Sequence, residues 1–248
     1  MAPTLLAVAH GSRDPRSAQT MTALMDVVAA ARPDLDVRLS FLDLATPTLG
    51  QQLAALNLEG VREIVVVPLL LGRAFHADVD VPEAVAQART YHHGLHVSVA
   101  DVLGADPRIV GAMLDRLGEA GADLADPELG VVLAAVGSSR AAANRALHQV
   151  AAALPVPRST VAFATADPSV ADAVAQLRHH GARRVAVGSW FLAPGLLPDQ
   201  VRRDVAGCAP GSVVAPAIGA HPALARVVLD RYDAATARQA VPEFSLAN

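Results

Sequence analysis

The sequence predicts an α/β fold in which each half of the 248-residue chain forms a parallel β-sheet covered by helices on both faces. Short, continuous apolar runs alternate with helix-like stretches along the whole chain. The motifs of the first half also return in the same order in the second: residues 8–13 (VAHGSR) match 134–139 (AAVGSS), and 45–48 (ATPT) match 166–169 (ADPS). The offset between matched motifs shrinks slowly, as expected of a duplicated domain whose loops have changed length.

The first half is expected to alternate four strands with four helices. Apolar runs bounded by turn residues are typical of strands buried on both faces. Arg32-Pro33 ends the first helix, because proline cannot continue it, and Gly60 closes the second. The expected strands are 4–9, 37–42, 63–71 and 95–100, and the expected helices are 16–31, 48–58, 81–91 and 107–120.

The second half repeats this order. Gly181 closes a helix at the place that matches Gly60, where a left-handed residue is easiest. Between the halves, residues 121–128 combine Gly, Ala, Asp and Pro without periodicity, which predicts a linker. The predicted domains are therefore 1–124 and 125–240. The expected strands are 129–136, 160–164, 184–191 and 212–215, and the expected helices are 140–153, 168–180, 198–206 and 222–237.

Composition excludes several classes of function. A net charge of −4 and an aromatic content of 3% argue against a nucleic-acid surface. The one cysteine, Cys208, excludes an internal disulfide and any zinc or iron–sulfur site built from cysteines. The apolar run at residues 5–9 is too short for a signal peptide or a membrane span. We expect a cytoplasmic protein that binds neither nucleic acid nor membrane.

Three residues with chemistry follow three successive strands of the first half. In open parallel sheets, ligands bind outside the carboxyl ends of the strands. His10 follows the first strand, Asp43 the second and His76 the third, so we expect all three at one edge. Two imidazoles and a carboxylate suit a divalent metal such as Fe²⁺, Co²⁺, Ni²⁺ or Zn²⁺, and histidine also accepts protons near neutral pH.

The second half does not repeat the histidines. Val136 stands at the place of His10, and Leu197 at the place of His76. The scaffold is thus present twice and the metal-capable side chains once, which predicts a single active site in the first half.

Each of these residues also has a structural interpretation. His10 could be a histidine bonded to backbone, and Asp43 a solvated residue at a strand end. Ser12 can cap the helix that begins near Pro15, or it could be the nucleophile of a serine hydrolase. The Gly-x-Ser-x-Gly elbow of such enzymes is absent, as are the glycine-rich signatures of nucleotide-binding folds. Arg13, Arg73 and Arg140 could bind a polycarboxylate ligand or be ordinary solvated arginines.

Three motifs of the first half resemble those of the sirohydrochlorin chelatases. They are residues 9–15 (AHGSRDP), residues 41–47 (FLDLATP), and residues 67–72 (VPLLLG) followed by 76–82 (HADVDVP). The second half fits the degenerate repeat of the long, two-domain members of that family. The resemblance implies a class II chelatase fold, in which two flavodoxin-like domains with four-stranded parallel sheets face each other across a central cleft. Residues 1–124 would carry the metal site, and residues 125–240 would form the opposite wall.

The resemblance also implies an activity, namely insertion of a divalent metal into sirohydrochlorin, an acidic tetrapyrrole, with loss of two protons. His10 and His76 correspond to the metal-binding, proton-accepting pair. Asp43 stands where the family commonly has Glu, and it retains the charge on a shorter side chain. Ser12, Arg13, Arg73 and Arg140 would bind the substrate and its peripheral carboxylates.

No organic cofactor is implied, because the metal is a substrate. Fe²⁺ for siroheme is favoured over Co²⁺ for cobalamin, since the cysteine cluster and His-rich tail of some cobalt-inserting relatives are absent. A monomer is plausible, because the fused repeat can supply both walls of the cleft. The alternative to an enzyme is a protein that binds metal or tetrapyrrole without turnover.

Overall fold

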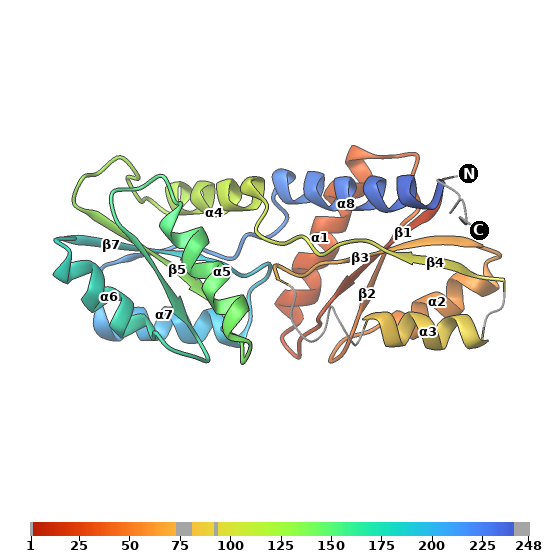
Figure 1. The fold of residues 1–248 in the computed structure, drawn as a ribbon, viewed down its shortest axis with the longest axis horizontal. Coiled ribbons are helices and arrows are strands. Elements are labelled where there is room, and N and C mark those ends of the chain that lie inside the picture. Colours follow the sequence, from red (N-terminus) through yellow and green to blue (C-terminus); the bar gives the residue numbers. More distant parts are fainter. Residues whose placement is uncertain (1, 73–80, 92–93, 241–248) are drawn as a thin grey trace, which may run out of the picture. The chain divides into compact units, whose positions relative to one another are not determined.

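The computed structural model describes residues 2–72, 81–91 and 94–240 (Figure 1). Two four-stranded parallel sheets lie in this part of the chain, with strand orders β2-β1-β3-β4 and β6-β5-β7-β8. The strands are β1 Thr4–Ala9, β2 Val37–Phe41, β3 Glu63–Pro68, β4 His96–Val99, β5 Leu129–Ala135, β6 Ser159–Phe163, β7 Arg184–Ser189 and β8 Val213–Val214. The predicted pair of parallel α/β domains is confirmed.

Helices alternate with the strands throughout the described chain. They are α1 Pro15–Ala31, α2 Leu49–Leu58, α3 Val81–Tyr91, α4 Pro107–Glu119, α5 Ala141–Ala152, α6 Val170–His179, α7 Leu196–Cys208 and α8 Pro222–Ala240. None of the described helices is both long enough and apolar enough to cross a membrane. Seven of the eight predicted strands extend past the observed carboxyl end, 63–71 by three residues, 184–191 by two and the others by one, because the apolar runs continue beyond the strands.

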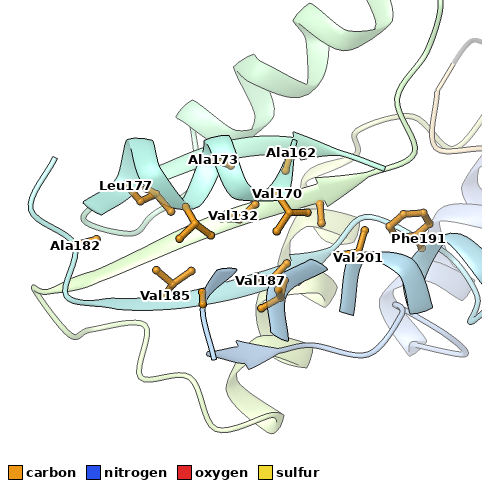
Figure 2. Packing of buried hydrophobic residues seen from close by; sticks show 14 residues of the cluster. Val132, Ala162, Val170, Ala173, Leu177, Ala182, Val185, Val187, Phe191 and Val201 are labelled. Carbon is orange, nitrogen blue, oxygen red and sulfur yellow. The ribbon is translucent and has the colours of Figure 1, made fainter. Parts of the chain in front are cut away.

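The central strands β1 and β5 are buried along their whole length, which explains their continuous apolar sequences. Around β5 the core is built almost entirely of small aliphatic side chains (Figure 2). The cluster includes Val132 of the sheet, Val170 and Leu177 of α6, and Val201 of α7. The first sheet has a similar aliphatic core under α2 and α3.

The turns that follow β2 and β6 have matching geometry. Thr48 caps α2 and Ser169 caps α6, each in a capping box with the residue three positions later. A cis peptide bond precedes Pro47 in the first turn and Pro168 in the second. The predicted duplication therefore extends to the detailed backbone of these turns.

The packing units of the molecule do not follow the two sequence halves. The described residues of Met1–Arg13, Leu24–Gly104 and Ala225–Asn248 form one compact unit, and those of Asp14–Ala23 and Ala105–Leu224 form the other. Helix α4, from the first half, packs against β7 of the second sheet. Most of helix α8, from the second half, belongs to the first unit. The predicted boundary at 124/125 and the predicted cleft stay predictions.

Candidate active site at the edge of the first sheet

His10 and Asp43 lie in neighbouring loops at the carboxyl edge of the first sheet. The backbone N–H of Leu42 donates to the carbonyl of Ala9 (2.9 Å), and the N–H of Asp43 donates to the carbonyl of His10 (3.0 Å). These bonds continue the β1–β2 pairing into the loops, so the two residues are adjacent across it. His10 and Asp43 are both exposed, and an ion could reach them from solvent.

His76 and Arg73 lie outside the described residues, as do Asp78 and Asp80. The segment that leads toward them leaves the sheet at the same edge, because Pro68 pairs with Val8 and the N–H of Leu69 donates to the carbonyl of Val8 (2.8 Å). Within residues 2–72, 81–91 and 94–240, the structure contains no group of three or more His, Cys, Asp or Glu side chains that could hold a metal.

Gly11 sets the approach between the two loops. Its φ is +94°, a conformation that side chains rarely adopt. A Cβ atom at this position would lie 1.7 Å from the carbonyl oxygen of Asp43. Only glycine therefore allows the backbone after His10 to pass this close to Asp43.

The Asp43 carboxylate takes part in its own turn. Its Oδ1 accepts a hydrogen bond from the backbone N–H of Leu44 (2.6 Å). Leu44 has a φ of +59° and is 45% exposed. Sequence reasoning missed Leu44. The signal that could have found it is the spacing between the strand and the proline, which is one residue longer than in the second half.

Ser12 and Arg13 follow Gly11 in the same loop, Ser12 half-buried and Arg13 exposed. The capping role considered for Ser12 belongs to Asp14, whose carboxylate accepts the backbone N–H of Arg16 (3.0 Å). The Arg16 guanidinium holds the pKa of the Asp14 carboxyl below its usual range. Arg140 lies exposed just before α5 in the second unit, and its N–H donates to Ser138 Oγ (3.1 Å).

The equivalent edge of the second sheet carries no histidine at the matched positions. Val136 takes the place of His10 and is 42% exposed, and Leu197 is half-buried. A pocket of about 380 Å³ opens at this edge and is lined in part by Arg16, Arg116 and Arg202. The first two arginines are engaged within the protein: Arg16 pairs with Asp14 and Asp199, and Arg116 bonds Glu119 and the carbonyl of Ile218.

Comparison with known proteins shows a family match to each half of the chain. The family model CbiX matches residues 4–120 and then matches again over residues 130–235. The chain belongs to the CbiX family. This double match confirms the predicted duplication and the predicted family resemblance.

Individual CbiX-family relatives align over much of the chain. A sirohydrochlorin ferrochelatase of Priestia megaterium is 28% identical over 235 residues, which cover 90% of this chain and 87% of the relative. A sirohydrochlorin cobaltochelatase of Methanosarcina barkeri is 29% identical over 123 residues, which cover 47% of this chain and 95% of the relative. The solved structure described as SirB from Bacillus subtilis with Fe³⁺ superposes with a TM-score of 0.82 at 26% identity and covers 96% of this chain and 97% of its own.

Proposed function

We propose that this protein is a metal chelatase that inserts a divalent metal ion into sirohydrochlorin. The observation that carries the proposal is the edge where exposed His10 and Asp43 lie in adjacent loops, beside the segment that leads to His76. Membership of the CbiX family and relatives named as sirohydrochlorin chelatases support the same substrate. Iron is the favoured metal, because two relatives that align over about nine-tenths of both chains are named ferrochelatases.

The reaction requires a metal ligand and a proton acceptor in one place. Insertion of M²⁺ forms bonds from the metal to the four ring nitrogens and releases two protons from the pyrrole N–H groups. The imidazoles of His10 and His76 would hold the incoming metal ion. As the metal ion passes to the ring, the same imidazoles would accept the protons that the pyrrole nitrogens release. Solvent at the exposed edge then takes the protons away.

Asp43 is proposed as an accessory proton acceptor. One of its carboxylate oxygens already holds the Leu44 N–H, which restricts how the group can reach toward a metal. The carboxylate could take up one of the protons that the pyrrole nitrogens release. The peripheral carboxylates of the substrate would be met by Ser12, Arg13, Arg73 and Arg140, for which guanidinium groups offer bidentate pairing.

An anaerobic spectral assay with sirohydrochlorin and either Fe²⁺ or Co²⁺ tests the activity and the metal together. The double variant His10→Ala, His76→Ala should lose at least about 100-fold in insertion rate, in the range by which positioned acid–base groups contribute. Wild-type rates in that variant would overturn the site assignment. Stoichiometric binding of sirohydrochlorin without faster insertion would instead identify a carrier.

The alternative hypothesis, that the protein is a serine hydrolase, is tested separately. If Ser12 were a nucleophile, Ser12→Ala would abolish ester hydrolysis and the wild-type protein would form a trappable acyl-enzyme. The chelatase proposal expects neither result, and it expects Ser12→Ala to affect the KM for sirohydrochlorin more than kcat.

A further inference from the structure

The turn after β2 contains one residue more than its counterpart in the second half. Both turns close with the same bond: the N–H of Phe41 donates to the carbonyl of Pro47 (3.0 Å), and the N–H of Phe163 donates to that of Pro168 (2.9 Å). They also begin alike, with Asp43 bonded to His10 and Thr165 bonded to Val136. The extra residue therefore lies between Asp43 and Pro47, beside the candidate metal site.

Leu44 has the conformation that accommodates this extra residue. Among the described residues it is the one non-glycine residue with a positive φ, +59°. Glycine or asparagine would adopt this conformation more easily than a branched apolar residue. The side chain is nevertheless a leucine and is 45% exposed, so burial in the protein's own core does not explain it.

The surrounding backbone holds Leu44 in a defined place. The Asp43 carboxylate accepts its N–H, and the Asp43 carbonyl rests against Gly11, whose missing side chain leaves the room. Asp43 is in turn bonded to His10 through the backbone. An exposed apolar residue thus directly follows the candidate carboxylate, in a turn that is hydrogen-bonded to the backbone of His10.

The second half shows that the fold does not need this residue. There the shorter turn closes the same hydrogen bond, contains the same cis proline bond and leads into the same type of helix cap. That half also has Val136 in place of His10. The extra residue is therefore present where the histidine is present and absent where it is absent, although both turns have the same structural task.

We propose that Leu44 is a positioning residue that contacts the flat, apolar face of the tetrapyrrole and holds the ring centre in reach of His10. The inference rests on the proposed function and names a substrate contact within that site. A leucine suits this task, because it gives apolar contact to a conjugated ring and has no atom that would compete for the metal. The fixed turn limits the conformational freedom lost when the ring binds.

The variant Leu44→Gly tests the proposal, because glycine retains the backbone conformation and removes only the side chain. Leu58→Ala is the matched control: Leu58 ends α2, is 88% exposed and lies away from the carboxyl edge. Leu44→Gly should raise the KM for sirohydrochlorin about tenfold, the size expected for loss of one buried leucine side chain. The KM for the metal and the melting temperature should not worsen, and Leu44→Met should restore most of the affinity.

Spectral titration with metal-free sirohydrochlorin separates this inference from the chelatase proposal, because it measures ring binding without turnover. Weaker ring binding by Leu44→Gly than by wild type and Leu58→Ala supports the contact even if no metal is inserted. Equal binding by all three proteins overturns it even if the wild type is an active chelatase.

Discussion

Gly11 is the single residue on which the approach of the His10 and Asp43 loops depends. In Gly11→Ala the new methyl group would meet the Asp43 carbonyl at 1.7 Å, in addition to the cost of a positive φ. We expect the free energy of unfolding to fall by about 2 to 3 kcal/mol. Because the clash is with backbone, the Asp43 loop must move, and metal insertion should fall as well. Denaturant unfolding and the insertion assay measure the two effects.

Gly137→Ala is the matched control in the second half. Gly137 has nearly the same φ, +93°, but a methyl group there would meet side-chain atoms of Phe163, Thr165 and Ala166 at 3.1 Å. The expected loss is smaller, about 1 kcal/mol, with little effect on insertion. Equal losses in the two variants would show that the approach to Asp43 adds nothing to the cost of the backbone conformation.

The role of the Asp43 charge can be tested separately from the role of its side chain in the turn. Asp43→Asn retains a side-chain oxygen that can accept the Leu44 N–H and removes the negative charge of the carboxylate. We expect an unchanged melting temperature and a fall in kcat of about tenfold, at the lower limit of acid–base contributions. A kcat equal to that of the wild type would leave Asp43 with the turn as its only role.

At the residue scale, the sequence predicted the adjacency of His10 and Asp43 and missed Leu44. The adjacency follows from topology, because successive parallel strands end at one edge. Leu44 carries no residue-type signal: an exposed leucine looks like any other apolar residue in a sequence. Its importance depends on a turn one residue longer than in the second half, which the sequence contains, and on a positive φ value, which the structure supplies.

At the scale of elements, an ion pair ties the start of β7 to the segment that precedes β5. Arg184 forms a double ion pair with Asp126, and these hydrogen bonds, together with one from the backbone N–H of Glu128, lower the pKa of Asp126 to about 2. The folded-state pKa is below the ordinary value of 3.8, so the stabilisation is present above pH 4 and is lost as the pH falls toward 2.

Asp126→Asn should therefore flatten the dependence of unfolding free energy on pH between about 4 and 2. Above pH 5 the variant should be less stable than the wild type, and the two should converge near pH 2. Urea unfolding at several pH values measures this slope, and Asp204→Asn, at an exposed position of α7, controls for the loss of one negative charge. Parallel pH profiles for wild type and Asp126→Asn would contradict the prediction.

The alternation of elements was predictable because apolar periodicity distinguishes buried strands from amphipathic helices. The ends of the strands were less predictable. The apolar run at residues 63–71 continues past Pro68, the last residue of β3, and Leu69 makes one more hydrogen bond, to Val8 of β1. Sequence hydrophobicity does not record where such bonding ends. Periodicity also does not indicate which sheet a helix packs against.

At the scale of the whole molecule, the two sequence halves exchange a helix. Gly188 in β7 lets α4 come close, since a Cβ there would lie 2.2 Å from the sulfur of Met113. In the first unit, Tyr232 of α8 donates to the carbonyl of Pro3 (2.6 Å), and Arg231 donates to the carbonyls of Val102 (3.0 Å) and Leu103 (2.9 Å). Chain order places α4 after β4 and says nothing of the sheet that it covers.

This exchange predicts the behaviour of a protein that ends at residue 124. Such a chain would carry α4, whose buried residues include Met113 and Leu117, but no second sheet to receive it. It would also lack α8, which the first unit uses. Because α4 and α8 occupy matching places in the repeat, each of two copies can offer its α4 to the other. We expect a dimer that unfolds in a concentration-dependent manner.

Light scattering and thermal unfolding at several protein concentrations measure the outcome. Met113→Glu places a charge on the buried face of α4, so in the half-length protein it should prevent dimerisation and, with it, cooperative unfolding. Arg108→Glu, at an exposed position of the same helix, should leave the dimer intact. A half-length monomer with a sharp, concentration-independent transition would show that the first sheet completes its fold without an exchanged helix. The alignment of this chain with a relative of about half its length would then reflect a self-sufficient half rather than one that needs a partner.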